Sequence, residues 1–128
     1  MPRAVGGSLV LAAACAALAS PQRIADREGP GVQNLIEWTP GVLSGAVPRG
    51  EEAFAHLKSL GVRTILSVDG ARPEVEIAQR YGLRYVHVPI RYNGVDAEPQ
   101  DAIAAALREL PRPIYIHCHH GKHRAPAA

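Results

Sequence analysis

The sequence has little net charge. Its 128 residues include 14 lysines and arginines and 12 aspartates and glutamates, so the formal charge is +2 with neutral histidines. This charge is too small to favour binding to nucleic acid or to an anionic membrane surface. Hydrophobic residues make up 47% of the chain and charged residues 20%, which is ordinary for one globular domain. We therefore expect no nucleic-acid partner and look for function in local groups of residues.

Charge is also absent from most of the N-terminal segment. Residues 1–19 contain one charged side chain, that of Arg3, followed by an uncharged run rich in Ala, Leu and Val. This pattern is typical of a signal peptide, and Ala17 and Ala19 are the small residues that favour cleavage after Ala19. The run is short for a membrane-spanning helix. We therefore expect an exported protein, periplasmic or secreted, with no stable membrane insertion after cleavage.

Cysteine is scarce as well, since Cys15 and Cys118 are the two in the chain. Signal cleavage would remove Cys15, so the mature chain could form no intramolecular disulfide. A lone thiol in an oxidising compartment is a liability unless it has a use, which makes Cys118 a candidate functional residue. A second interpretation of the leader is a lipoprotein, because "LAAAC" resembles a lipoprotein cleavage box with Ala12 where leucine is usual.

Strand and helix patterns alternate along the rest of the chain. Residues 20–33 carry Pro, Gly and charges without apolar periodicity and predict an extended linker, so we place one domain at 34–128. The alternation predicts an α/β fold with a mostly parallel central sheet flanked by helices. The expected strands cover residues 34–38, 42–48, 62–68, 83–90 and 114–117, and the expected helices cover 50–61, 72–82 and 100–111.

The stretch "HCHHGKHR", residues 117–124, follows the last expected strand. In parallel α/β sheets, ligands bind beyond the carboxyl ends of the strands. Five residues separate Cys118 from Arg124, with Gly121 among them, so the loop can turn its backbone N–H groups toward one anion at the start of a helix. The same N–H groups and the nearby guanidinium favour the thiolate of Cys118. The stretch therefore predicts a phosphate site with a nucleophilic cysteine.

These residues also fit a known signature. "HCHHGKHR" matches the HC-x5-R signature of the cysteine-dependent protein tyrosine phosphatase superfamily, and it most resembles the loops of the compact, atypical dual-specificity branch. "GVLSGAVP", "LKSLGVRTILSV" and "YVHVPI" resemble strands and a helix of the same branch. The resemblance implies a protein tyrosine phosphatase-like fold and hydrolysis of phosphate monoesters through a phosphocysteine, with no cofactor. The substrate would be a phosphorylated protein or a small polyanionic phosphate.

The resemblance further implies roles for the loop residues. Cys118 would be the nucleophile, Arg124 would hold the phosphate, and His117 would tune the thiolate from the neighbouring position. Backbone N–H groups would cradle the phosphate, and they belong to His119, His120, Gly121, Lys122, His123 and Arg124.

Two positions depart from the family pattern. The family has Ser or Thr after the loop arginine, where the hydroxyl helps the cysteine leave; Ala125 stands there, which predicts slow breakdown of the phosphocysteine. The family's general acid is an aspartate in the loop after the "HVP" strand, but Tyr92 and Asn93 occupy the closest positions. We assign the general acid to Asp96, the carboxylate best placed within this loop.

A third departure is that the chain ends four residues after Arg124, where a helix should begin. We therefore expect the C-terminal helices of the fold to be missing, and Ile114 and Ile116 of the last strand to be exposed. This departure, together with the missing hydroxyl, supports an alternative function. The chain would then be an inactive or degenerate domain that binds phosphate without turning it over.

The histidines of the loop also allow a metal-site interpretation. His119, His120 and His123 alternate around a tight loop and are expected to fan outward, and the sequence has no second Cys/His cluster. We therefore predict no metal ion. Asp69, which directly follows the expected strand at 62–68, is expected to be a solvated loop residue with no catalytic part.

Overall fold

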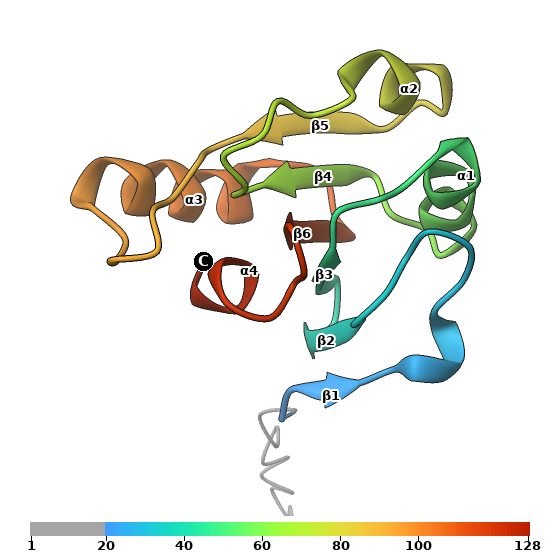
Figure 1. Cartoon of the computed structure of the whole chain (residues 1–128), viewed down its shortest axis with the longest axis horizontal. Helices are drawn as coiled ribbons and strands as arrows, with labels where there is room; N and C mark the ends of the chain where they lie inside the picture. The colour runs from blue at the N-terminus through green and yellow to red at the C-terminus, as the bar shows by residue number, and fades with distance from the viewer. Residues whose placement is uncertain (1–19) are drawn as a thin grey trace, which may run out of the picture.

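A six-stranded sheet forms the centre of the molecule. The structure, a computed structural model, describes residues 20–128, so the predicted signal peptide and Cys15 lie outside the described residues. The strand order is β1-β2-β3-β6-β4-β5, and helices lie on both faces (Figure 1). The strands are β1 (Gln22–Arg23), β2 (Ile36–Thr39), β3 (Val42–Ala46), β4 (Thr64–Ser67), β5 (Arg84–His87) and β6 (Ile114–Cys118). The helices are α1 (Glu51–Ser59), α2 (Val75–Arg80), α3 (Ala97–Glu109) and α4 (Arg124–Ala127), with a 3-10 turn η1 (Ala25–Arg27).

Four neighbouring strands of this sheet run parallel. β3 pairs with β6, β6 with β4 and β4 with β5 in parallel register, whereas β1 and β2 add antiparallel strands at one edge. The register places Ala46 opposite Cys118, and Ser67 opposite His117. The carboxyl ends of β3, β4 and β6 therefore meet, and the loops that follow them lie together. The predicted α/β fold with a mostly parallel sheet is confirmed.

The first core layer lies between the sheet and the helices α1 and α2. Phe54 and Leu57 of α1 and Ala78 of α2 are buried in one cluster with Ile65 and Tyr115 of the sheet. Phe54 and Leu57 are three residues apart, so they lie on the same side of their helix and form its apolar stripe. This layer fixes the strands that carry the candidate site from one side.

The second core layer lies under α3 and α4, on the opposite face. Ile103 and Ala106 of α3 and Ala125 of α4 share one buried cluster with Ile114 and Ile116 of β6. The two isoleucines are 0% and 4% exposed, so the expectation that they would be exposed is wrong. The reason is that β6 is an interior strand of the sheet, and α3 packs over it although it follows the edge strand β5 in sequence.

Residues 20–33 are not the extended linker that we expected. β1 pairs with β2, and the N–H of Ile24 donates to the carbonyl of Leu35 at 3.0 Å. Val32 is fully buried in the cluster under α1. A strand of two residues is too short to show hydrophobic periodicity, so β1 can be recognised only from its pairing with β2.

Helix boundaries differ from the expected ones by a few residues. α3 begins at Ala97, three residues before the expected start at Gln100, because Pro99 is compatible with the first turn of a helix, where a backbone N–H is not needed. α2 begins at Val75, whereas the expected helix began at residue 72 and included Pro73 in its first turn. In the described part of the chain, residues 20–128, no helix has the length and apolar composition needed to cross a membrane.

Candidate active site

A tight loop joins β6 to α4. β6 ends at Cys118 and α4 begins at Arg124, so the intervening residues turn around the cysteine. Gly121 has φ +73°, a conformation that residues with a side chain disfavour, and its N–H donates to Sγ of Cys118 at 3.2 Å. Cys118 itself is 3% exposed. The loop that was predicted to hold an anion therefore directs a backbone donor at a buried thiol.

The loop rests against the end of β3. A Cβ atom on Gly121 would lie closer than 3.0 Å to the backbone of Gly45, so only glycine allows this approach. On its outer side, the carbonyl of His120 accepts a hydrogen bond from Nδ2 of Asn34 at 2.9 Å. The same peptide unit carries the N–H of Gly121, which points the opposite way, toward the sulfur of Cys118.

The surroundings of Cys118 favour its thiolate. Burial by itself raises the pKa of the thiol, but the backbone N–H groups around the sulfur, among them the hydrogen-bonded N–H of Gly121, outweigh burial, so the pKa is lowered from its ordinary value of 9.0. The N–H groups that lower this pKa belong to Ala125, His123, Gly121 and Arg124. Since the thiolate is the reactive form of cysteine, this loop favours the reactive form of Cys118.

His117 lies beside the cysteine with both ring nitrogens engaged. The carbonyl of Cys118 can only accept, so Nδ1 of His117 donates to it at 3.3 Å, and Nε2 accepts the hydroxyl hydrogen of Tyr85 at 2.6 Å. Burial lowers the pKa of His117 to about 4. Burial also raises the pKa of Tyr85 above its usual range. Both side chains are therefore neutral near pH 7, and His117 acts on the loop as a fixed, uncharged hydrogen-bonding group.

Arg124 is buried at the start of α4, with 8% of its surface exposed. Its Nη2 donates to Oδ1 of Asp69 at 2.9 Å and to the hydroxyl of Tyr92 at 3.0 Å. The ring of Tyr92 also covers the guanidinium, with 4.2 Å between Cζ and the ring centroid. Nε is buried and finds no hydrogen-bond partner among the described residues. An anion in the loop would satisfy this donor.

Asp69 belongs to this site, and the expectation that it is a solvated loop residue is wrong. Asp69 is 6% exposed and contacts Arg124, from which it is 55 residues distant in sequence. It comes two residues after β4, which pairs directly with β6, so the loops that follow the two strands are neighbours. A carboxylate just after a buried strand was the available signal. The strand order, which decides that this loop faces Arg124, was not visible in the sequence.

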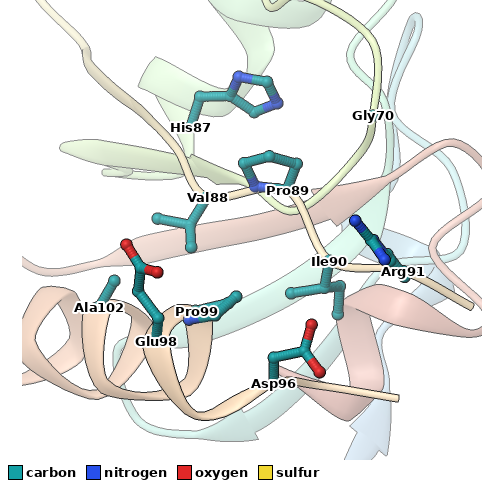
Figure 2. Close-up of a pocket in the computed structure, with 10 residues that line it drawn as sticks. All are labelled: Gly70, His87, Val88, Pro89, Ile90, Arg91, Asp96, Glu98, Pro99 and Ala102. Atoms are coloured by element: carbon teal, nitrogen blue, oxygen red, sulfur yellow. The ribbon is translucent and has the colours of Figure 1, made fainter. Parts of the chain in front are cut away.

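A pocket of about 630 Å³ is lined by Gly70, by residues at the end of β5 and in the loop that follows it, and by the start of α3 (Figure 2). A Cβ atom on Gly70, which lines the pocket, would lie 4.0 Å from Nη1 of Arg124. The pocket is large enough for an organic group attached to a phosphate bound in the loop. Its polar lining residues are His87, Arg91, Asp96 and Glu98, and its apolar ones include Val88, Pro89, Ile90, Pro99 and Ala102.

Asp96, the predicted general acid, lies in this pocket. It is the exposed residue that precedes α3, and its side chain makes no capping hydrogen bond to the helix. In Figure 2 its carboxylate points toward the wall formed by Ile90. The structure therefore places the Asp96 carboxylate in the same pocket as Gly70, the lining residue near Arg124, while the role of Asp96 as proton donor stays a prediction.

The other polar side chains of the loop face solvent. His119, His120, Lys122 and His123 are all exposed. Nδ1 of His119 lies 3.9 Å from Oδ2 of Asp69. Within residues 20–128, no three His, Cys, Asp or Glu side chains are grouped so that they could hold a metal ion. The exposed side chains instead form a rim of titratable and cationic groups around the loop.

Comparison with known proteins gives matches among solved structures. No family model and no curated protein sequence matches the chain. A DUF442 protein from Shewanella putrefaciens CN-32, provisionally named a phosphatase, matches with a TM-score of 0.61 and 26% identity over 71% of this chain and 62% of its own. P. aeruginosa TpbA matches with a TM-score of 0.58 and 27% identity over 77% of this chain and 65% of its own. The core catalytic domain of the PP-IP phosphatase Siw14 from S. cerevisiae matches with a TM-score of 0.56 and 24% identity over 65% and 54%.

These matches agree with the loop signature. The chain has the α/β fold of the cysteine-based protein tyrosine and dual-specificity phosphatases, and it is similar to phosphatases of that class at 26–27% identity. The chain spans less than two thirds of the length of each of these structures, namely 62%, 65% and 54%.

Proposed function

We propose that this chain is a phosphatase that hydrolyses phosphate monoesters through a phosphocysteine on Cys118. The observation that carries the proposal is the buried sulfur of Cys118, which accepts the N–H of Gly121 and whose pKa is lowered by backbone N–H groups of the loop and of α4. The buried Nε of Arg124, unpartnered among the described residues, adds a further donor at the same loop. A phosphate dianion suits such a set of donors.

The proposed reaction has two steps. The thiolate of Cys118 attacks phosphorus, so that an S–P bond forms, the P–O bond to the leaving group breaks, and the leaving oxygen takes up a proton. Water then attacks phosphorus, the S–P bond breaks, and inorganic phosphate and the thiolate are released. In both steps Arg124 and the loop N–H groups stabilise the negative charge on the phosphoryl oxygens.

We propose Asp96 as the group that protonates the leaving oxygen. A general acid must come within hydrogen-bonding reach of that oxygen. Asp96 lines a pocket that Gly70, a neighbour of Arg124, also lines, and we propose that the leaving group lies in this pocket. Ala125 presents a methyl group directly after Arg124, where a hydroxyl would help to expel the thiolate. We therefore expect the second step to be slow and the phosphoenzyme to accumulate.

A second candidate function is phosphate binding without turnover. Two observations favour it: Ala125 lacks the hydroxyl, and Nη2 of Arg124 is already engaged by Asp69 and Tyr92. A domain of this kind would bind vanadate or phosphate and form no phosphoenzyme.

The substrate class that we propose is a phosphorylated protein or a small polyanionic phosphate. A TpbA variant was solved in complex with phosphotyrosine, and Siw14 is described as a PP-IP phosphatase. The exposed Lys122 and the three exposed histidines of the loop would supply positive charge for either substrate. We further propose export with cleavage after Ala19, which N-terminal sequencing of the exported protein would test.

Hydrolysis of p-nitrophenyl phosphate by the full chain tests the proposed activity. We expect turnover by the wild type, with an early burst of p-nitrophenol, and none by Cys118→Ser. Activity that survives this substitution would refute the mechanism. Vanadate binding without any burst would select the second candidate function.

A further inference from the structure

We propose that Asp69 is a positioning residue: its carboxylate holds the guanidinium of Arg124 in the orientation that binds the phosphate. This inference rests on the proposed function. The side chains of Asp69 and Arg124 are 9% and 10% exposed, so the pair is buried together. The two residues come from different loops, one after β4 and one after β6, and the pairing of these strands brings them into contact. The pair therefore connects the phosphate loop to a second, independent segment of the sheet.

The contacts of Asp69 hold its carboxylate in one orientation. Oδ1 accepts the N–H of Gly70 at 2.8 Å and Nη2 of Arg124 at 2.9 Å. Oδ2 lies 3.9 Å from Nδ1 of His119. The backbone carbonyl of Asp69 accepts a hydrogen bond from Nε2 of His87 at 2.7 Å. The hydrogen bonds from Gly70 and His87 therefore hold Asp69 in place independently of its contact with Arg124.

The geometry of the guanidinium explains what this anchor does. A guanidinium is planar, so a bond at one nitrogen restricts the direction of all of its N–H groups. With Nη2 held by Asp69, the buried and unpartnered Nε retains an N–H for an anion. The other partner of Nη2 is the hydroxyl of Tyr92, a residue that is 73% exposed. Asp69 is therefore the buried partner that holds Arg124 in place, whereas Tyr92 is the exposed partner that a substrate can displace.

Charge adds a second consequence. Asp69 and a bound phosphate dianion would both lie next to one guanidinium, and like charges at that distance repel. Asp69 therefore orients Arg124 at some cost in affinity for the dianion. A group that keeps the hydrogen bond but loses the charge should separate these two effects.

Two substitutions of Asp69 separate its effect on the orientation of Arg124 from the effect of its charge. In Asp69→Asn the amide oxygen can replace Oδ1 toward Gly70 and Arg124 without a negative charge, whereas Asp69→Ala removes the acceptor. We expect Asp69→Ala to lower kcat for p-nitrophenyl phosphate by roughly 10- to 100-fold, as misplacement of a catalytic group by about 1 Å does. We expect Asp69→Asn to keep kcat within about threefold and to lower KM, because a repulsive charge has been removed. Asp101→Asn, at an exposed position on α3, is the matched control and should change neither constant.

The outcomes discriminate between the possible roles of Asp69. If Asp69→Asn loses as much kcat as Asp69→Ala, Asp69 acts through its charge or its proton and the positioning role is refuted. If kcat is unchanged in both variants, or falls only in proportion to a loss of folded protein measured by circular dichroism, the proposal is refuted as well.

A binding measurement separates this proposal from the proposed function. Tungstate, a phosphate-like anion, can be titrated calorimetrically into the wild type and both variants, whether or not the chain turns over substrate. We expect weaker tungstate binding by Asp69→Ala than by the wild type, and binding by Asp69→Asn at least as tight as by the wild type. This result in a chain without turnover would support the positioning role and refute the phosphatase. Equal binding by all three proteins would refute the positioning role.

Discussion

Replacing Gly121 by alanine tests whether the close contact between the loop at 118–124 and β3 is essential. Gly121 has φ +73°, and a Cβ atom there would lie closer than 3.0 Å to the backbone of Gly45. The new methyl group meets main-chain atoms of an interior strand, which cannot rotate away as a side chain could. The loop must therefore move as a unit.

The expected magnitude has two parts. An alanine in the left-handed region costs about 1–2 kcal/mol. Overpacking against a fixed neighbour typically costs about 1–3 kcal/mol more. Gly121→Ala should therefore lower the free energy of unfolding by about 2–5 kcal/mol.

Gly61 offers a matched control for the first part. It has φ +85°, and a Cβ atom there would meet no heavy atom within 4 Å. Gly61→Ala should therefore show the backbone cost alone. Guanidinium denaturation followed by the fluorescence of Trp38, the one tryptophan of the chain, measures both variants on the same scale.

The same substitution should also weaken the site. Gly121 donates its N–H to Sγ of Cys118 at 3.2 Å, and this bond is one of those that lower the pKa of the thiol. Displacing the loop should raise that pKa, so alkylation by iodoacetamide at pH 7 should become slower in Gly121→Ala than in Gly61→Ala. The reasoning would be refuted if the two alanine variants were equally stable and reacted at equal rates.

Other groups of the site give three shorter predictions. Because the pKa of Cys118 is lowered, its alkylation rate should reach a plateau at a lower pH than that of a free cysteine, and a midpoint near pH 9 would contradict this. If Asp96 protonates the leaving oxygen, Asp96→Asn should slow hydrolysis of alkyl phosphates far more than of p-nitrophenyl phosphate, whose leaving group needs little protonation; equal losses would exclude this role. The pKa of His117 falls from 6.5 unfolded to about 4 folded, so its contribution to stability is full above pH 6.5 and is lost as the pH falls toward 4; His117→Gln should flatten the dependence of unfolding free energy on pH in that window.

Most of the strands and helices could be predicted because their patterns are local. The segment at 62–68, predicted as a strand, contains β4, and the segment at 50–61, predicted as a helix, contains α1. The segment at 20–33 could not be predicted in this way. Its strand β1 exists through hydrogen bonds to β2, and two residues show no period of their own.

The expectation of exposed strand residues was wrong for a related reason. Ile114 and Ile116 are apolar, but their sequence does not say which helix covers them. The structure places α3 over β6, so both side chains are buried with Ile103. Coverage of a strand depends on how the chain crosses the sheet, and this follows from the strand order rather than from the strand itself.

The sequence by itself determined which reactive groups the loop at 118–124 brings together. Cys118, Gly121 and Arg124 lie within seven consecutive residues, and their spacing, together with a preceding strand, is enough to bring a thiol, a tight turn and a guanidinium together. The tertiary structure decided which carboxylate meets that guanidinium. Asp69 does so because β4 pairs with β6, and this pairing brings Asp69 next to Arg124, 55 residues away in the sequence. Which strands pair depends on the packing of the whole sheet and not on any short stretch of sequence.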